Sequence, residues 1–332
     1  LAFPLIFVPL ILVLAAGGFY YYREESTKRK VARREKALVA LGKEFEKEYG
    51  DYLGIAFIGQ GAMGVVEKGV RKDRLSADGI AAIKTILLRN LEAFTIEEKE
   101  ERMESAIDRF RREAKILQST NHPNIPRLYE WGEKEKELYI VMEFLDGRDL
   151  EDYLKENGDR LSVPEIREIF SQLSSALDYL HQRGVFHRDL KPANIQRTEG
   201  GKIKILDFGL AISAQATKRI TKAGDVMGTL DYMAPEALLG NEPDASFDQF
   251  AVGVIVFQML TGSLPLAHIT NPTLGDYIQP RRSVKECDAD ISDEIAAVVD
   301  KMLSLDPKDR FESVHAAFEA FEQAGEVAHF ST

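Results

Sequence analysis

The first 22 residues of the chain are uncharged and mostly apolar. At about 1.5 Å of rise per residue, a helix of this length spans roughly 33 Å, enough to cross the hydrocarbon core of a bilayer. A signal peptide or a buried helix would also be apolar, but a signal peptide normally carries its positive charge before the apolar region. Here the basic residues come afterwards and are densest over 28–34. We therefore expect one transmembrane helix over 1–22 in the cell (inner or plasma) membrane, with the rest of the chain in the cytoplasm.

The segment after this apolar stretch changes from helical to strand-like periodicity. Apolar residues at helical spacing in a highly charged background predict a connecting helix over 28–49. From 51 to 70, short apolar runs separated by glycines predict twisted antiparallel strands, and 79–88 has the pattern of a further strand. Residues 95–117 predict an amphipathic helix that begins with a capping box. Two more strands are expected over 127–131 and 138–144.

After Asp149 the pattern becomes mostly helical. Ser162 and Glu165 have the spacing of a capping box, which predicts a helix from there to about Arg183. Residues 247–260 are apolar almost all round, which predicts a buried helix, because the segment is short and its polar side chains count against a membrane span. These polar side chains are Asp248, Gln249 and Gln258. Strands followed by helices indicate an α+β chain with two lobes.

Composition narrows the function without naming it. The 332 residues carry a net charge of −11, which argues against nucleic acid as a partner, because phosphate contacts need clustered Lys and Arg. The single cysteine, Cys287, excludes an internal disulfide framework and suits a reducing compartment. We assign no function to this thiol.

Glycines within 59–66, in the sequence GQGAMGVV, match a pattern that binds phosphates, because glycine lets a backbone approach an anion closely. A dinucleotide-binding fold uses similar glycines but needs a helix directly after them, whereas here a strand pattern follows. That pattern leads to Lys84, which lies between apolar neighbours and needs an anionic partner if it is buried. Glu113, on the same side as the apolar face of the helix expected over 95–117, offers one.

Three polar residues later in the chain suit a magnesium site. Asp189 and Asn194 lie in the segment HRDLKPANI, and Asp207 begins the tripeptide DFG. Short strands expected over 195–197 and 202–206 would bring Asp207 back beside Asn194, and oxygen ligands suit Mg²⁺, which keeps waters and bridges phosphates. Asp189 remains as the carboxylate able to accept a proton from a substrate hydroxyl. Zinc or hydrolase chemistry is disfavoured, because no second histidine, cysteine or serine elbow has suitable spacing.

Taken in order, these motifs resemble those of protein kinases over roughly 52–321. Lys191 is the residue that serine/threonine kinases carry at this position, and the sequences GAMGVV, HPNIPRLYE and GTLDYMAPE are most similar to the Hanks-type kinases of bacteria. The resemblance implies a bilobal α+β fold, in which a small β-rich lobe with one helix precedes a larger helical lobe. It also implies ATP as the phosphoryl donor, Mg²⁺ or alternatively Mn²⁺ as the metal ion, and Ser/Thr hydroxyls of proteins as acceptors.

The implied roles fall on residues that match the motifs of this family. Catalytic roles fall on Asp189, Lys191, Lys84 and Glu113. Nucleotide contacts fall on Gly59, Gly61, Gly64, Val66, Ala82, Lys84, Glu143 and Asp149. Metal ligation falls on Asn194 and Asp207. His187 would pack near Phe208 in a structural role, Arg310 resembles the partner of Glu236 that stabilises the helical lobe, and Asp248 resembles the residue that ties down the catalytic loop.

The domain organisation follows from the same resemblance. We expect 1–22 to be the transmembrane helix and 23–50 to be a charged juxtamembrane helix or linker. The kinase domain would cover 51–325, with an N-lobe over about 51–145 and a C-lobe over about 146–325.

Regulation is expected in the loop between Asp207 and Glu236. Thr217 and Thr221 are the candidate autophosphorylation sites, because in the family the arginine equivalent to Arg188 pairs with a phosphate on this loop. A homodimer would let one copy phosphorylate the other. Two alternative functions stay open, a pseudokinase scaffold at the membrane and a small-molecule kinase of the same broad fold. The complete set of catalytic groups disfavours the first, and the segment APE together with the late Arg310 disfavours the second.

Overall fold

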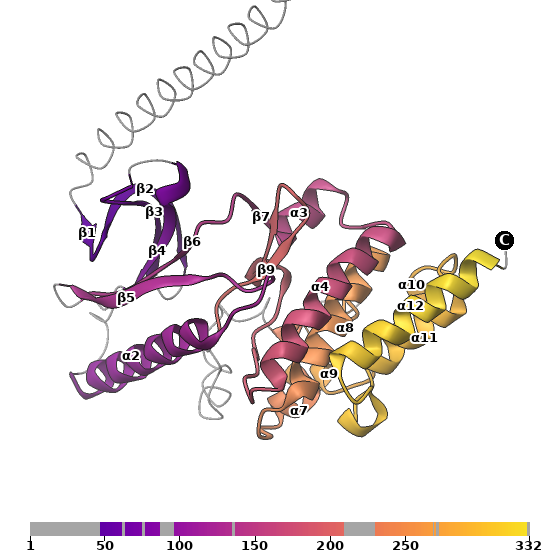
Figure 1. The fold of residues 1–332 in the computed structure, drawn as a ribbon. Helices are drawn as coiled ribbons and strands as arrows, with labels where there is room; N and C mark the ends of the chain where they lie inside the picture. Colours follow the sequence, from indigo (N-terminus) through magenta and orange to yellow (C-terminus); the bar gives the residue numbers. More distant parts are fainter. Residues whose placement is uncertain are drawn as a thin grey trace, which may run out of the picture. The chain divides into compact units, whose positions relative to one another are not determined.

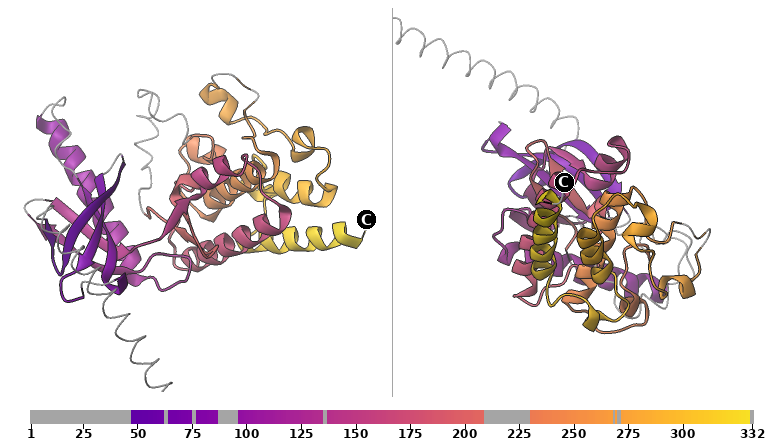
Figure 2. Two further views of the ribbon diagram at one scale, coloured as in Figure 1. Left: turned by 90° about the horizontal axis from the view of Figure 1, so that it is seen from above. Right: turned by 90° about the vertical axis from the view of Figure 1, so that its right-hand side faces the viewer.

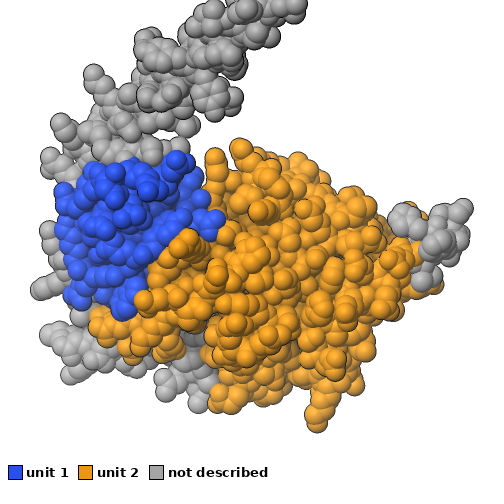
Figure 3. Space-filling view, viewed as in Figure 1, with its two compact units in different colours: residues 1–94, 129–144 blue, residues 95–128, 145–332 orange. Residues whose placement is uncertain are grey.

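The computed structural model of the chain describes residues 47–330 apart from 62–63, 75–76, 87–95, 135–136, 209–229, 268 and 270–271. The chain divides into two compact units, which Figure 3 colours separately. Unit 1 is formed by the described residues of 1–94 and 129–144, and unit 2 by those of 95–128 and 145–332. The transmembrane helix expected over 1–22 lies outside the described residues. Within the described part, no helix combines the length and the apolar character that a membrane span requires.

Unit 1 is built around a six-stranded sheet with the strand order β1-β2-β3-β4-β6-β5 (Figure 1). The strands are β1 (Glu48–Tyr49), β2 (Tyr52–Gly61), β3 (Gly64–Arg71), β4 (Ile80–Ile86), β5 (Leu128–Lys134) and β6 (Glu137–Glu143). A short 3-10 helix, η1 (Ala77–Gly79), precedes β4. The pairs β1–β2, β2–β3, β3–β4 and β4–β6 are all antiparallel. The strands expected within 51–70 and over 79–88, 127–131 and 138–144 are therefore confirmed.

The two faces of this sheet have different roles. One face carries a buried cluster of Tyr49, Tyr52, Ala81, Ile83, Tyr139 and Val141. Val66 on β3 pairs directly with Lys84 on β4, so both side chains belong to the opposite face, because neighbouring residues of a strand alternate between faces.

The helix expected over 28–49 is wrong at its end, where residues 48–49 form strand β1 instead. Gly50 has a φ of +53° in the reversal that follows, and this lets Tyr49 pair with Tyr52 in an antiparallel ladder. The rest of that expected helix, 28–46, lies outside the described residues.

Unit 2 contains the helices and a small three-stranded sheet of order β7-β8-β9 (Figures 1 and 2). The longer helices are α2 (Ile96–Ser119), α3 (Leu150–Glu156), α4 (Val163–His181), α8 (Ala245–Thr261), α11 (Asp293–Met302) and α12 (Val314–Phe330). The short ones are η2 (Pro192–Asn194), α7 (Pro235–Leu238), α9 (Leu274–Tyr277), α10 (Val284–Cys287) and η4 (Pro307–Asp309). The strands are β7 (Gly147–Asp149), β8 (Ile195–Thr198) and β9 (Ile203–Ile205). The helices expected over 95–117, from Ser162 to about Arg183 and over 247–260 are confirmed as α2, α4 and α8.

Helix α8 forms the centre of unit 2. It is buried on all sides, as its apolar sequence predicts, and it packs against α4, α11 and α12. Helix α12 also packs on α4, where Phe318 and Phe321 meet Phe170 edge-on, with ring centroids 5.4 and 5.6 Å apart.

The capping box expected from Ser162 and Glu165 is wrong in its side-chain contacts. Ser162 is the N-cap residue of α4, but its side chain makes no capping hydrogen bond. The Glu165 carboxylate has other partners, because it accepts a hydrogen bond from the Tyr153 hydroxyl and lies 3.3 Å from Nη2 of Arg197. Tertiary partners have replaced the local reciprocal bond that the spacing predicts.

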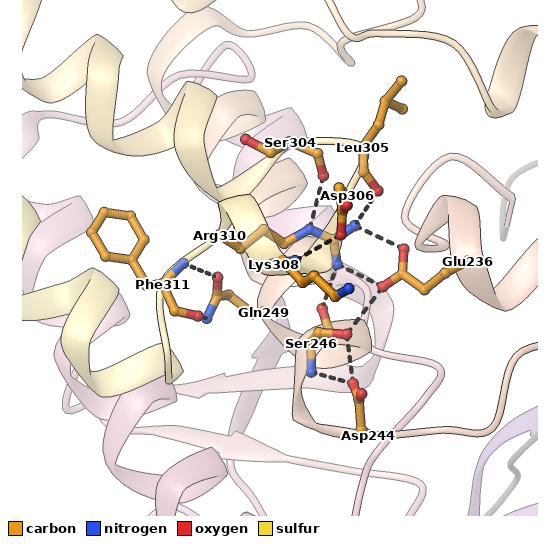
Figure 4. A network of polar contacts seen from close by, with 10 residues as sticks. All are labelled: Glu236, Asp244, Ser246, Gln249, Ser304, Leu305, Asp306, Lys308, Arg310 and Phe311. Atoms are coloured by element: carbon orange, nitrogen blue, oxygen red, sulfur yellow. Dashed lines mark hydrogen bonds and ion pairs between the residues drawn. The ribbon is translucent and has the colours of Figure 1, made fainter.

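A buried ion pair joins α7 to the segment after α11 (Figure 4). Nη1 and Nη2 of Arg310 lie 2.6 and 2.7 Å from the two carboxylate oxygens of Glu236, which is the bidentate geometry of a strong charge-assisted contact. The remaining guanidinium N–H groups donate to the backbone carbonyls of Ser246, Ser304 and Leu305. The expected pairing of Arg310 with Glu236 is confirmed, and its complete hydrogen bonding offsets the desolvation of both charges.

Candidate active site

One buried carboxylate holds the segment 187–189 in place. Asp248, on α8, is 1% exposed and accepts hydrogen bonds from the backbone N–H groups of His187 at 2.9 Å and Arg188 at 2.8 Å. The Nε2 atom of His181, the last residue of α4, lies 2.7 Å from the same carboxylate. The expectation that Asp248 ties down this segment is confirmed.

The environment of Asp248 keeps its carboxylate ionised. Burial by itself raises the pKa of a carboxyl group, because the charged form loses its hydration. The hydrogen bond and charge of His181, the nearby imidazole of His187 and the N–H of Arg188 outweigh burial and hold the pKa of Asp248 below its ordinary value. Asp248 therefore acts as a fixed negative acceptor inside the helical unit.

His187 has a structural place in this segment. Its side chain is completely buried, and its Nε2 lies 2.7 Å from the carbonyl oxygen of Leu206, which requires Nε2 to carry the hydrogen. Its ring packs edge-on against Phe208 with a centroid separation of 5.3 Å. The expected packing of His187 near Phe208 is confirmed, and the imidazole connects segment 187–189 to segment 206–208.

Asp189 lies between two polar side chains of its own segment. Nδ2 of Asn194 donates to the backbone oxygen of Asp189 at 2.7 Å and to its Oδ2 at 3.1 Å. Nζ of Lys191 lies 3.3 Å from the same Oδ2. The Asp189 side chain retains 16% of its exposure, so the carboxylate is oriented by its neighbours but still accessible to a substrate.

The strand pair β8–β9 brings Asp207 toward this cluster. The backbone N–H of Leu206 donates to the carbonyl of Asn194 at 2.8 Å, so the residue after Leu206 follows directly on a contact with Asn194. Arg188 and Asp207 have φ values of +67° and +60°, a left-handed conformation that is unusual for residues with a side chain. Such backbone strain gathers at functional sites, where the surrounding structure enforces it.

The donor atoms of Asn194 and Asp207 fit a magnesium ion. Because both amide hydrogens of Asn194 are directed at Asp189, its Oδ1 is the atom left for a cation. Among the residues that the structure describes, no group of three or more His, Cys, Asp or Glu side chains is placed to hold a metal. A cation at Asn194 and Asp207 would thus take its other ligands from water and phosphate, which is the coordination that Mg²⁺ favours.

The nucleotide contacts expected in unit 1 gather on one face of its sheet. Lys84 is 8% exposed and pairs with Val66 on β3, and Ala82 lies two residues away on the same strand and face. Neither a positive φ nor internal packing requires glycine at position 59, because an added Cβ there would meet no atom within 4 Å. A glycine in such a position suits the close approach of a ligand.

The structure does not bring every expected site residue to this face. Glu143 pairs with Ala81, so its side chain belongs to the face opposite Lys84. In unit 2, Oδ1 of Asp149 accepts from the backbone N–H of Asp152 and caps α3.

Other expected roles stay predictions. Gly61 and Gly64 end the paired part of the β2–β3 hairpin, whose tip lies outside the described residues. Glu113 is buried on α2 in unit 2, so its pairing with Lys84 of unit 1 remains an expectation. Thr217 and Thr221 lie outside the described residues.

The motif pattern did not indicate His181 as a partner of the site. Its signal in the sequence was weak, since it lies four residues after the buried Leu177 on the apolar face of α4. Only the fold places this imidazole against Asp248, which lies 67 residues later in the chain.

A small, mainly apolar hollow lies beside Asp189 in unit 2. Leu190, Met233, Ala234 and Phe247 contribute apolar walls to it, and Arg188 and Asp189 contribute its polar edge. Tyr232 also borders the hollow and donates from its hydroxyl to Oε1 of Gln258 at 2.7 Å. The hollow thus joins the segment before α7 to the segment that carries Asp189.

Sequence comparison agrees with this arrangement. The protein kinase domain family matches residues 52–321 of the chain. The probable serine/threonine-protein kinase PknB of Lactococcus lactis is 33% identical over 279 residues, which cover 83% of this chain and 42% of that protein. The serine/threonine-protein kinase pkn3 of Myxococcus xanthus is 36% identical over 283 residues, which cover 81% of this chain and 49% of that protein. The chain therefore spans less than half the length of these relatives.

Solved structures show the same fold. The kinase domain of Mycobacterium tuberculosis PknI has a TM-score of 0.65 at 24% identity, covering 85% of this chain and 98% of that one. Rad53 1-466 in complex with AMP-PNP has a TM-score of 0.64 at 31% identity, covering 84% of this chain and 68% of that one. The β-rich unit and the helical unit together define a protein kinase fold. The chain belongs to the protein kinase family, and several of its relatives are bacterial serine/threonine-protein kinases.

The lowered pKa of Asp248 leads to a pH-dependent prediction. A carboxyl group whose pKa is lower in the folded state stabilises the fold above its unfolded pKa of about 3.9, and this contribution is lost as the pH falls through the folded pKa. We expect Asp248→Asn to lower the free energy of unfolding by about 2 to 4 kcal/mol at pH 7, because buried N–H donors lose a charged acceptor. The difference from the wild type should narrow below about pH 4.

Urea unfolding at pH 7, 5 and 3.5 measures this effect. Asp244→Asn is the matched control, since Asp244 is the exposed N-cap of the same helix and asparagine caps equally well. An Asp248→Asn deficit that is absent at pH 7, or that keeps its size at pH 3.5, would contradict the assigned role.

Proposed function

We propose that this chain is an ATP-dependent protein kinase that transfers the γ-phosphoryl group to Ser or Thr hydroxyls of proteins. The observation that carries the proposal is the arrangement of Asp189, whose carboxylate is accessible and is oriented by Asn194 and Lys191. A lysine in this position is the residue type that serine/threonine kinases use. The names of the bacterial relatives support the same acceptor class, and the AMP-PNP complex of Rad53 supports a nucleotide of the ATP type.

The residues of the cluster suit an in-line displacement. The acceptor hydroxyl oxygen attacks the γ-phosphorus, the bond from that phosphorus to the bridging oxygen of ADP breaks, and the hydroxyl proton passes to Asp189. Nζ of Lys191, 3.3 Å from Oδ2 of Asp189, lies where a cation would balance the transferred charge. Mg²⁺ held by Asn194 and Asp207 would neutralise charge on the phosphates.

The apolar hollow beside Asp189 supports a protein as the acceptor. A peptide residue next to the phosphorylated Ser or Thr would find an apolar surface formed by Leu190, Met233 and Phe247. A small metabolite has no comparable side chain to place there, so the hollow favours a peptide over a small-molecule acceptor.

The apolar first 22 residues support a membrane-anchored enzyme. Basic residues after this stretch favour a single-pass topology with the kinase domain in the cytoplasm. The anchor would keep the enzyme beside membrane-bound substrates or signals and would raise the local concentration of a second copy.

Arg188 supports regulation by phosphorylation. Its Nε is buried and has no hydrogen-bond partner among the residues that the structure describes. Burial lowers the pKa of this guanidinium and nearby Arg112 adds to the effect, although Asp248 opposes it. A phosphate on Thr217 or Thr221 carries about −1.5 to −2 charge and would supply the missing acceptors. A homodimer would allow this phosphorylation to occur between two copies.

Substitution of Asp189 tests the catalytic proposal. Asp189→Asn preserves shape but removes the proton acceptor, so kcat should fall by about 10²- to 10⁴-fold with nucleotide affinity nearly unchanged. The assay follows transfer from radiolabelled ATP with Mg²⁺ to a generic basic protein. The exposed Asp290→Asn is the control. A wild-type protein that binds ATP without transferring phosphate would favour the pseudokinase scaffold instead.

Deletion of residues 1–22 tests the anchor. The wild-type chain should sediment with membranes, and the truncated chain should remain in the supernatant with the same specific kinase activity, because the deleted stretch supplies the apolar surface. A truncated protein that still sediments with membranes would refute this assignment.

Replacement of both threonines tests the regulatory proposal. After preincubation with ATP, the wild type should accelerate, and more so at higher protein concentration, because phosphorylation between copies is bimolecular. Thr217→Ala/Thr221→Ala should lose that acceleration, whereas Ser119→Ala, at an exposed hydroxyl on α2, should keep it. Equal acceleration in the double variant and the wild type would exclude these threonines as the switch.

A further inference from the structure

Residues 47–51 form a structured strand and turn that precede the family match at residue 52. The backbone N–H of Gly54 donates to the carbonyl of Lys47 at 3.0 Å, and Tyr49 pairs with Tyr52. After the turn, the backbone N–H of Asp51 donates to Oε2 of Glu130 at 3.2 Å. The short segment is therefore fixed to the sheet at several points and is part of unit 1.

Charged side chains hold the beginning of this segment from outside. Nζ of Lys72 lies 2.7 Å from Oε2 of Glu48, and Nζ of Lys134 donates to the Glu48 carbonyl at 2.7 Å. These contacts are exposed and each stabilises the strand only weakly. Their effect is to keep Glu48 at the sheet edge, so that the following residue, Tyr49, points into the sheet's buried face.

Tyr49 satisfies a buried acidic group in the middle of β3. Its hydroxyl donates to Oε2 of Glu67 at 2.6 Å, and the two side chains are 2% and 8% exposed. Gly54 leaves room for the ring, because an added Cβ there would lie 3.3 Å from Cε2 of Tyr49. Burial, followed by the hydrogen bond and charge of Glu67, raises the pKa of Tyr49, so the hydroxyl keeps the proton it donates.

Glu67 lies directly behind the residues expected to bind the nucleotide. On β3 it is next to Val66, and across the sheet it pairs with Ile83, the neighbour of Lys84. Val66 and Lys84 pair with each other and share the opposite face of these same strands. Any shift of the backbone at Glu67 would therefore move the two residues that form the nucleotide face.

We propose that the Tyr49–Glu67 pair is a positioning pair for nucleotide binding, through which the segment before the kinase domain fixes the place of Lys84. Without the hydroxyl, the Glu67 carboxylate would be buried without that partner and would be drawn toward water, because an unsatisfied buried charge is costly. The β3–β4 ladder would yield at its centre, and Lys84 would leave the position that suits the phosphates. The inference rests on the proposed ATP-dependent function.

Direct titration with AMP-PNP and Mg²⁺ tests the pair. The full 332-residue chain is used, kept in detergent because of its apolar first 22 residues, well below the melting temperature of each variant. Tyr49→Phe removes only the hydroxyl and should raise the Kd for AMP-PNP by about five-fold or more. Tyr49→Phe/Glu67→Met replaces both partners by apolar groups of similar size and should restore the Kd to within about two-fold of the wild type.

Tyr139→Phe is the matched control. It removes a hydroxyl of the same buried cluster that donates to Oε1 of Glu130 at 2.9 Å and does not involve β3. This variant should lower the melting temperature and leave the Kd for AMP-PNP within about two-fold of the wild type.

The outcomes separate positioning from mere stabilisation. A Tyr49→Phe variant that melts earlier but binds AMP-PNP like the wild type would overturn the positioning role. So would a double variant that binds as weakly as Tyr49→Phe alone, because the unpaired carboxylate would then not be the cause. A wild-type chain that binds no AMP-PNP would instead overturn the proposed function on which the inference rests.

Discussion

The buried carboxylate of Asp248 is the constraint on which the catalytic segment depends. A charge placed at the centre of a helical core is tolerated only when every available lone pair has a donor. Two of these donors are backbone N–H groups of residues 187–188, so satisfying the charge and positioning the segment are one event. The left-handed φ of Arg188 persists because those bonds compensate for it. The orientation of Asp189, one residue later, follows from this anchored backbone.

The same principle organises the rest of the helical unit, where the polar residues of α8 each hold a different segment. Gln249 exchanges two hydrogen bonds with the backbone of Phe311, at 2.9 and 3.0 Å, and so holds the chain next to Arg310. Gln258 accepts from Tyr232 beside the apolar hollow. An apolar helix gives no direction to its neighbours by hydrophobic contact alone, whereas each of these directional bonds fixes one segment. The polar residues that argued against a membrane span are thus the ones that specify the fold.

Local pattern was sufficient for much of this structure. Helices α2, α4 and α8 and the strand pairs around Lys84 follow from periodicity, and the spacing of Asp189 and Asn194 indicated their contact. Prediction failed where a tertiary partner replaced a local one, as when Glu165 bonded to Tyr153 and Arg197 instead of capping α4. A capping box competes with every other donor that the fold brings within reach, and those donors are not visible in the sequence.

The segment 48–49 shows the limit of periodicity most clearly. Its charged neighbours suggested a solvated helix, because Glu48 and Lys47 are typical of a helix surface. What decides its structure is a single long-range bond, in which Tyr49 reaches the buried Glu67, 18 residues later. The sequence shows an acidic residue within a strand pattern but not the donor that makes it tolerable. A buried acidic residue in a predicted strand is therefore a reason to search the flanking segments for its partner. In this chain that partner lies outside the part that matches the kinase family.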